Sequence, residues 1–599
     1  PQSEFPYSKL LQENRSRNRL ELEYELADTG VFDEERYFDC QIEYTKNSAD
    51  DILIRLTVTN RGPNASTIHI LPQWWYRNTW TWNCTQEGCT PKPMIRTEDD
   101  GKIHGYHTTL GHWIMAVDCS SDGQDAKYLF TDNETNTDLH PDAPSTSGSF
   151  KDAFHNYVVH GREGAVAPQP KGTKVASYTE HLIQPGESVV IRARMCQAEL
   201  SPTEWFGQPF DQSFSQRKQE ADEFYASVIP AGTTADEKLV MRQAYAGLLW
   251  TKQFYHYCVN SWLEGDDNYR INTDQRRFGR NHDWQHLFNR DVISMPDKWE
   301  YPWYAAWDLA FHMLPMAEVD PNFAKDQLIL FLREWYMHPS GAIPAYEWAL
   351  SDVNPPVHAW ACWNIYQMGQ KAGYEDKDFL ARAFQKLLLN FTWWVNRKDP
   401  EGNHIFSGGF LGLDNIGVFD RSKPLPTGGA LNQADATAWM AFFCGVMLDI
   451  ALELAPERGA YADMASKFFE HYVSIADATN ALHNTGLWDD QDGFYYDHLA
   501  KDGESIPLRV RSLVGLIPLC TPVILDEAKI ANLPGFLKRT EWFLQNRQDM
   551  SKHMNYMTRE CEEGQEHGMR LLALPSTERL LRLLEVMLDE NEFLSPYGI

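Results

Sequence analysis

The sequence predicts a chain of two parts, an N-terminal antiparallel β-sandwich followed by an α-toroid of helical hairpins. Two observations predict this fold. Apolar residues alternate with a period of two from about residue 20 to 200, and the period becomes helical after a stretch rich in Pro and Gln. We therefore expect a sandwich over 1–200, a linker over 201–233 and a helical domain over 234–599, within the two to four domains that 599 residues suggest.

The strands are predicted from alternation and from turn residues. Ile52, Ile54 and Leu56 alternate with polar residues, and Asn60-Arg61-Gly62-Pro63 marks a turn after them. The stretch 176–195 reads as a hairpin-like pair around Pro185-Gly186. Many short strands without intervening helices predict an antiparallel sandwich. Further strands are expected at 20–26, 38–44, 66–71, 112–117 and 127–130.

The helical part begins with a capping box formed by Thr234 and Glu237. Met241 and Tyr245 then lie on one face of the helix that follows. Helices separated by long aromatic loops are typical of an α-toroid, in which the loops at one end build a pocket. Further helices are expected at 322–337, 377–396, 434–454, 458–478 and 575–589.

Charge and composition exclude some partners. A formal charge of −30 repels phosphate backbones and anionic lipids, so we expect neither nucleic-acid binding nor membrane attachment. No apolar run approaches about 18 residues, and the N-terminal stretch has no signal-peptide core. The 10 cysteines are scattered without a zinc-ribbon spacing, so we expect mostly free thiols and a cytoplasmic location.

Aromatic residues are abundant, at 13% of the chain. Flat apolar rings with a polar edge suit sugar binding, because an indole stacks on the C–H face of a pyranose. Aromatic-rich cores would give the same composition, so this observation alone leaves both interpretations open.

The loops contain the carboxylates and tryptophans that chemistry on a sugar requires. Hydrolysis of a glycosidic bond needs a carboxylic acid to protonate the leaving oxygen and a second carboxylate to activate water or attack the anomeric carbon. Aromatic walls desolvate such an acid and raise its pKa. Each loop taken alone is weak evidence, because an Asp beside Gly and Asn usually forms a turn or helix cap. The loops are 295–312, 341–360, 406–419, 428–439 and 487–498.

Four motifs occur in the order in which they occur in the family-63 glycoside hydrolases, and the chain resembles the large bacterial and fungal members of that family. The resemblance covers about 235–599 and implies a sandwich joined to an (α/α)6 toroid. It also implies an exo-acting inverting α-glucosidase, similar to the inverting trehalases. The motifs are Trp307-Asp308, Gly341-x-x-Pro344 with Asn354-Pro355-Pro356, Gly412-Leu413-Asp414-Asn415, and GFYYD at 493–497.

The resemblance also implies roles for single residues. Asp414 occupies the position of the family's general acid, and Asp308 would bind hydroxyls of the sugar whose bond is cleaved. Trp-Asp before an apolar run can also be a helix N-terminus with a favourable dipole partner, so this interpretation of Asp308 stays open. The pocket would be lined by Trp303, Trp307, Trp348 and Asn354.

One departure concerns the general base. In the family the base is a glutamate near the end of the toroid, after a Tyr/Asn-Trp-Arg-Gly-Pro segment, and the chain ends at SPYGI without either. We expect the base to lie outside these residues and the ring to be short of its final hairpins, leaving apolar walls exposed. Glu592 is the fallback, as the only late glutamate in an aromatic loop containing Gly and Pro.

Three alternatives remain. His282-Asp283-Trp284-Gln285-His286 mimics H-E-x-x-H and would suggest a metallohydrolase, although its surroundings have no helical period. A glycoside phosphorylase would need an anion nest, for which 276–280 is the candidate. A carbohydrate-binding protein would keep the pocket without the acid. We expect no cofactor and no metal, and an α-glucoside or oligosaccharide as the substrate. The sequence fixes neither the glucoside nor the oligomeric state.

Overall fold

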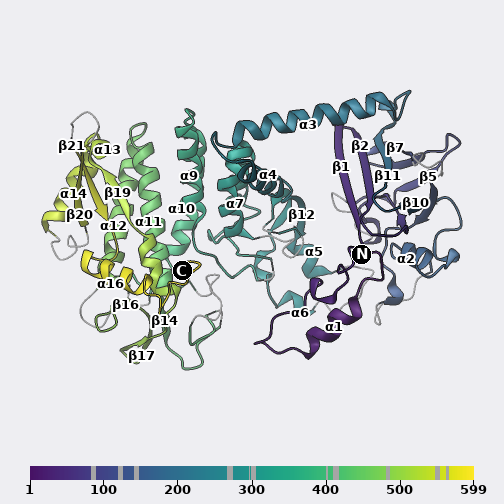
Figure 1. Ribbon diagram of the computed structural model, residues 1–599. Helices are drawn as coiled ribbons and strands as arrows, with labels where there is room; N and C mark the ends of the chain where they lie inside the picture. Colours follow the sequence, from purple (N-terminus) through teal and green to yellow (C-terminus); the bar gives the residue numbers. More distant parts are fainter. Residues whose placement is uncertain are drawn as a thin grey trace. The chain divides into compact units, whose positions relative to one another are not determined.

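The computed structural model divides the chain into two compact units, each described by itself (Figure 1). The first contains Pro1–Ser227, and the second contains Val228–Glu264 and Asn272–Ile599. Antiparallel sheets make up the first unit and helices dominate the second, which confirms the predicted order of the two parts. The structure describes residues 1–82, 89–118, 126–139, 147–265, 274–295, 297–298, 305–347, 349–399, 402–408, 417–421, 423–480, 486–546, 554–560 and 566–599.

Two antiparallel sheets form the first unit. The larger has the order β1-β2-β11-β7-β6-β5-β9, and the smaller joins β3, β8 and β4 to β10. Their inner faces share apolar cores, in which Trp74 of the small sheet packs with Ile95 and Met115 of the large one. The strands are β1 Phe38–Ser48, β2 Asp51–Asn60, β3 Ser66–Ile70, β4 Gln73–Trp75, β5 Met94–Thr97, β6 Ile103–His107, β7 Gly111–Asp118, β8 Lys127–Thr131, β9 Lys171–Gly172, β10 Lys174–Ile183 and β11 Ser188–Gln197.

Two strand predictions are wrong. The stretch 176–195 forms strands around Pro185-Gly186, but β10 pairs in the small sheet and β11 pairs with β2 and β7 in the large one. The turn therefore crosses between layers, which alternation along one strand cannot reveal. Residues 20–26 form no strand; their acidic residues follow helix α1 (Tyr7–Ser16) on the surface.

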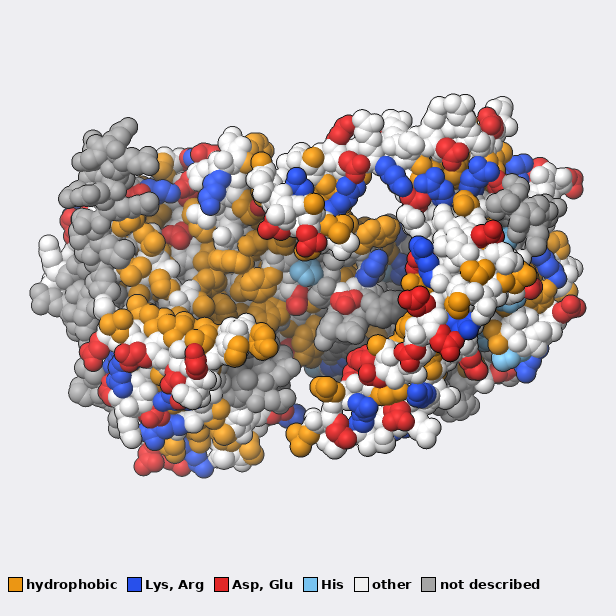
Figure 2. Space-filling view, viewed as in Figure 1, with side chains coloured by type: hydrophobic (Ala, Val, Ile, Leu, Met, Phe, Trp, Pro, Cys, Tyr) orange, Lys and Arg blue, Asp and Glu red, His pale blue; other side chains and the backbone are white. Residues whose placement is uncertain are grey.

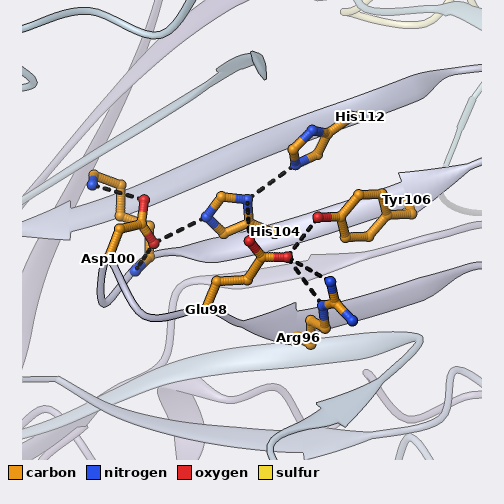
Figure 3. A network of polar contacts seen from close by, with 7 residues as sticks. Arg96, Glu98, Asp100, His104, Tyr106 and His112 are labelled. Atoms are coloured by element: carbon orange, nitrogen blue, oxygen red, sulfur yellow. Dashed lines mark hydrogen bonds and ion pairs between the residues drawn. The ribbon is translucent and has the colours of Figure 1, made fainter.

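The outward face of the large sheet is covered in part by helix α3 (Gln208–Val228), which lies within the segment expected as a linker. Phe210 and Phe214 of α3 pack on Leu53 of β2. On the same face, toward the β9 edge of the sheet, a network of polar side chains joins β5, β6 and β7 (Figure 3). His104 lies between Asp100 and His112, at 3.0 Å from each.

Helices of the second unit follow one another as antiparallel neighbours. In Figure 1, α9, α10, α11 and α12 stand side by side, and each contacts the next. Leu387 of α10 and Met447 of α11 belong to one large apolar core. The helices are α4 Ala235–Leu249, α7 Ala306–Val319, α8 Pro321–Phe331, α9 His358–Lys371, α10 Lys377–Val395, α11 Ala434–Leu454 and α12 Gly459–Asn480.

The periodicity located most of these helices, but the segments 295–312 and 341–360, expected as loops, contain the first half of α7 and the first three residues of α9. The alternative interpretation of Trp307-Asp308 as a helix N-terminus is confirmed. Pro315 lies inside α7, and α9 starts directly after Pro355-Pro356, so prolines hide both helices in the sequence. The helix expected at 322–337 ends at Phe331, where the chain turns at Leu332. The capping box of Thr234 and Glu237 is present as predicted.

Short sheets, absent from the sequence prediction, surround these helices. A hairpin of β12 (Lys252–Cys258) and β13 (Phe288–Ser294) precedes α7. After α10 come β14 Ala430–Asn432, β15 Trp488–Asp489, β16 Phe494–Tyr495, β17 Asp497–Lys501, β18 Glu504–Leu508, β19 Val523–Asp526, β20 Met554–Glu560 and β21 Glu566–Leu572. Helices α13 (Glu527–Ala531), α14 (Pro534–Asn546) and α16 (Thr577–Met587) lie among them in sequence.

Helix α11 is more apolar than the sequence analysis allowed. Among the described residues, α11 is the single helix whose length and composition would allow it to cross a membrane. From the sequence we expected no apolar run of this length. However, 78% of its apolar window is buried inside the structure. Burial in the core of the second unit accounts for its composition.

The described cysteines are mostly free. Cys196, Cys362 and Cys444 are buried thiols, and burial raises the pKa of each. Cys89 is disulfide-bonded. The three buried thiols act as small apolar residues in the cores.

Candidate active site

A narrow cleft in the second unit contains two of the residues that the motifs singled out. Trp307 at the start of α7 and Asn354 before α9 both line it, together with His358 and Asn390. The cleft is small, with a cavity volume of about 20 Å³. Its remaining lining residues are Ala306, Ile343, Pro355, Pro356, Val357 and Trp394.

Backbone contacts hold the two loops of this cleft together. Ala306 N–H donates to the Ala345 carbonyl at 3.0 Å, which joins the first residue of α7 to the loop that begins at Gly341. Asn390 Nδ2 of α10 donates to the Gly341 carbonyl at 2.8 Å. Gly341 has a φ of +95°, a conformation that favours glycine. The Gly341-x-x-Pro344 motif therefore fixes the loop beside Trp307.

Asp308 lies in the first turn of α7, next to Trp307, but it is not among the residues lining the cleft. A carboxylate in a first turn interacts favourably with the helix dipole. Burial lowers the pKa of His312, one turn further along, and the nearby Asp308 charge opposes that shift. Asp308 therefore acts on the helix and on His312, and its role toward a substrate stays a prediction.

Three other predicted site residues, Asp414, Trp303 and Trp348, lie outside the described residues. Of the six residues proposed for the site, the structure brings Trp307 and Asn354 together in one cleft and places Asp308 beside them.

Aromatic side chains continue from the cleft along the helices. Trp307, Phe311 and Trp360 contact one another edge to face, with ring centroids 5.9 and 5.5 Å apart. Trp363 of α9 and Trp439 of α11 are also only partly buried against the core. Figure 2 shows apolar side chains gathered on the face of the second unit that contains α9, α10 and α11. Such rings can pack against the C–H faces of sugars.

A second narrow cleft lies beside a buried ion-pair cluster of Arg421, Asp435 and Asp497. Arg421 donates to both oxygens of Asp435, at 2.8 and 2.6 Å, and to Asp497 at 3.1 Å. The Arg421 and Asp435 side chains are 5% and 0% exposed. Arg421 and Asp497 line the cleft with Gly417, Val418, Phe419, Leu431, Tyr495, Tyr496, Leu508, Val510, Ser512 and Val514.

Two carboxylates share one guanidinium in this cluster. Burial and the neighbouring Asp435 raise the pKa of Asp497, although Arg421 and the Ala434 N–H favour its charged form. Ala434 is the first residue of α11, so the helix N-terminus partly compensates the excess negative charge. A carboxyl held between charged and neutral forms in this way is typical of functional sites.

Two buried donors, Arg421 Nε in this cluster and Trp439 Nε1 further along α11, have no partner. Buried N–H groups are nearly always hydrogen-bonded, so the unpaired donor of Arg421, a residue that lines the cleft, suits an acceptor from a ligand. Sequence reasoning missed Arg421 and included Asp435 only as the carboxylate of the segment 428–439. Asp497 was quoted only as the last residue of the GFYYD motif.

The histidines of the H-E-x-x-H-like stretch do not face a common point. His282 Nδ1 lies 2.6 Å from the Gly279 carbonyl, whereas His286 Nε2 lies 3.3 Å from the Met337 carbonyl. Residues 282–284 form a short 3-10 turn in place of the α-helix that such a motif needs. Within the described ranges, no group of three His, Cys, Asp or Glu residues has the arrangement of a metal site.

The basic stretch 276–280 packs against an aromatic ring. Arg276 and Arg280 lie over the Trp262 ring, at 5.3 and 5.1 Å from its centroid. Arg276 also donates to the Trp262 carbonyl at 3.0 Å. These contacts give at least Arg276 a structural role.

Glu592 forms an ion pair with Arg511 at 2.9 Å and is 36% exposed. Arg511 also contacts the Asp492 carbonyl at 3.4 Å, so Glu592 is tied to the loop before the GFYYD segment. Its distance from Asp414 is not defined by the described residues.

Residues 301–415 match the family model of the mannosylglycerate hydrolase MGH1-like glycoside hydrolase domain. The chain contains a glycoside hydrolase domain. The motifs' resemblance to a glycoside hydrolase is confirmed for this segment, which includes Trp307, Asp308 and Asp414.

A relative extends this similarity over nearly the whole chain. The uncharacterized protein YMR196W of Saccharomyces cerevisiae is 42% identical over 653 residues, which cover 99% of this chain. The chain spans 59% of the length of that relative.

Solved structures from Thermus thermophilus also match part of the chain. One, a GH63 mannosylglycerate hydrolase in complex with Tris and D-glycerate, is 18% identical, covering 38% of this chain and 68% of its own. A complex of the same enzyme with glucose is 16% identical over the same shares. Their TM-scores of 0.29 and 0.30 are too low to establish a common fold.

Proposed function

We propose that the protein is an exo-acting inverting α-glycosidase that removes terminal α-glucosyl residues from an oligosaccharide or a small glucoside. In this proposal Asp414 protonates the leaving oxygen and Asp308 binds hydroxyls of the departing sugar. Trp303, Trp307, Trp348 and Asn354 line the pocket, and the helical hairpins belong to an (α/α)6 toroid.

One observation carries the proposal: the glycoside hydrolase match contains both proposed carboxylates and the cleft of Trp307 and Asn354. An indole beside an amide offers the two contacts that a sugar needs, an apolar face and a hydrogen-bonding group. The unpaired Nε donor of Arg421, which lines the second cleft, supports the binding of a ligand rich in hydroxyls.

The description of the family model favours a second substrate. A mannosylglycerate carries an α-mannosyl group on a small organic acid, so hydrolysis would proceed by the same acid with a different sugar in the first subsite. The two candidates differ in the sugar released and in the charge of the leaving group.

A substrate panel separates the candidates. Maltose, glucosylglycerate and mannosylglycerate would be incubated with the protein, and the released sugar and its first anomer followed by NMR. Release of β-glucose from an α-glucoside is the expected result. Release of mannose alone would favour the second candidate, and release of α-glucose would contradict inversion.

Variants test whether the cleft takes part. Asn354→Ala should raise KM or lower kcat/KM at least tenfold, since a lost hydrogen bond to a hydroxyl costs about 1.4 kcal/mol or more. Asn591→Ala changes an amide on the exposed C-terminal turn and serves as the matched control. Equal rates in all three proteins would contradict a substrate role for the cleft. Strict dependence on inorganic phosphate would instead indicate a phosphorylase.

A further inference from the structure

A wider hollow lies in the first unit, on the outward face of the large sheet beside α3. It has a cavity volume of about 620 Å³, against about 20 Å³ for either cleft in the second unit. All its lining residues belong to the first unit, so it is distinct from the candidate active site. We call it the α3 groove, and its lining residues are Gln41, Glu43, Arg55, Thr57, Asp118, Val190, Arg192, Asp211 and Lys218.

Four charged side chains form one row across the groove. The strand registers place Glu43 opposite Arg55, Arg55 opposite Arg192, and Arg192 opposite Asp118. The two residues at each end of the row are hydrogen-bonded to each other: Arg55 donates to Glu43 at 2.7 Å, and Arg192 donates to Asp118 at 2.5 Å. The two arginines in the middle lie side by side, an arrangement that costs free energy on a sheet without a compensating partner.

The charged groups of this row are held in fixed positions. Arg55 lies over the Phe214 ring at 4.5 Å and Arg192 over the Phe206 ring at 5.8 Å. Lys218 of α3 reaches Glu43 from the other wall, at 2.5 Å. Although burial opposes it, hydrogen bonds from Lys218 and Arg55 lower the pKa of Glu43, so this acceptor stays charged at neutral pH. A preorganised row of this kind binds a ligand with little loss of side-chain entropy.

The charges of the lining decide between classes of ligand. Arg55, Arg192 and Lys218 balance Glu43, Asp118 and Asp211, so the groove is neutral within a chain of charge −30. An anion would gain from the cations but face three carboxylates, and a cation would meet the reverse. A neutral molecule whose groups both donate and accept can satisfy the cations and the carboxylates together.

Vicinal hydroxyls have this property, since each donates one hydrogen bond and accepts others. On the floor, Gln41, Thr57 and Val190 form a second row across β1, β2 and β11, which adds an amide, a hydroxyl and an apolar contact. We propose that the α3 groove is a binding site for a neutral oligosaccharide, separate from the hydrolytic site. Its size suits a ligand of two or three sugar rings.

Binding can be measured on the full chain in the Asp414→Asn background, which suppresses hydrolysis if the proposed function is correct. The probes are maltotriose, α-1,2-mannotriose, cellotriose and, as an anion, citrate. Isothermal titration gives the affinity, and hydrogen–deuterium exchange locates the site. We expect at least one trisaccharide to bind with a sub-millimolar Kd and to protect peptides of β1 and α3.

Two variants test the groove. Gln41→Trp fills its floor on the exposed edge strand, and an aromatic residue suits a strand. Arg192→Met removes one guanidinium, with its contact over Phe206, but keeps an unbranched side chain. Each should weaken the groove's binding at least tenfold. Arg61→Met is the matched control, because it breaks a surface ion pair with Asp39 outside the groove and should change the Kd less than twofold.

The outcomes are distinct. Protection of β1 and α3 by a trisaccharide that persists in Gln41→Trp, the absence of such protection by every trisaccharide, or protection by citrate in their place would each overturn the proposal. The proposal is supported if the groove variants lose this binding but hydrolyse substrate at the normal rate when Asp414 is retained. The hydrolytic function can fail independently, since its readout is sugar release and depends on the second unit.

Discussion

Acidification should destabilise the second unit through His358, the first residue of α9. Its side chain is 5% exposed and its Nε2 lies 2.9 Å from the Leu328 carbonyl. Burial lowers the pKa of His358 to about 4, although the contact with Leu328 opposes the shift. An unfolded histidine titrates near pH 6.5, so the unfolded chain binds the proton first.

The sign and size of the effect follow from this difference. Because the folded pKa is depressed, the stabilisation is fully present above about pH 6.5 and is lost as the pH falls toward 4. At pH 5 the unfolded histidine is almost fully charged and the folded one mostly neutral. The resulting loss is about 2 kcal/mol of unfolding free energy at pH 5, and about 3 kcal/mol at pH 4.

A matched variant isolates this contribution. In His358→Gln, the amide can donate to the Leu328 carbonyl but does not titrate. Urea midpoints, followed by the tryptophan fluorescence of the second unit, would be measured for both proteins from pH 7.5 to 4.5. Other buried histidines affect both proteins equally, so only the difference between them matters.

The unmodified protein should lose about 2 kcal/mol relative to His358→Gln between pH 7.5 and 5. If the difference between the two proteins stays constant over this range, His358 is not buried in its neutral form and the reasoning is refuted.

Four further predictions concern the site. Asp414→Asn should lower kcat by several orders of magnitude for poor leaving groups but less for a glycosyl fluoride, and equal losses would argue against a general acid. Asp308→Asn should lower kcat/KM to a similar extent for all leaving groups. If activity is recovered with a glycosyl fluoride, Asp308 is the general acid and Asp414 binds the sugar. Gly341→Ala should cost about 2–4 kcal/mol in urea unfolding, because its Cβ would lie 2.2 Å from the Leu389 carbonyl oxygen at a φ of +95°; an unchanged midpoint would contradict this. Arg421→Met should cost about 3–5 kcal/mol at pH 7 and less at pH 5, where Asp497 can take up a proton; a loss independent of pH would contradict this account of the cluster.

The sequence predicted the elements whose burial follows a regular period. Helix α10 occupies 377–395, close to the expected 377–396, because its buried residues recur every three or four positions. β10 and β11 were found as strands but assigned to one hairpin, since alternation reports which side of a strand is buried and not which strand lies beside it. Pairing across layers depends on contacts far apart in the chain.

The same limit applies to the site. Trp307 and Asn354 were found because each lies in a short local motif, and the structure places both in one cleft. The Arg421 cluster joins residues 14 and 76 positions apart, so no local spacing indicates it. An aspartate such as Asp435, in a sequence of small residues, looks like a helix cap until its partner is known.

The first turn of α11 explains why this cluster bears on the proposed acid. Gly408 and Arg421 flank the segment that contains Asp414, and both are bound by this turn. Gln433 accepts a hydrogen bond from the Gly408 N–H, and Asp435 accepts two from Arg421. One rigid, buried helix thus fixes both ends of the segment. The buried charge at Asp435 costs stability, and the two hydrogen bonds that it accepts from the buried Arg421 offset that cost.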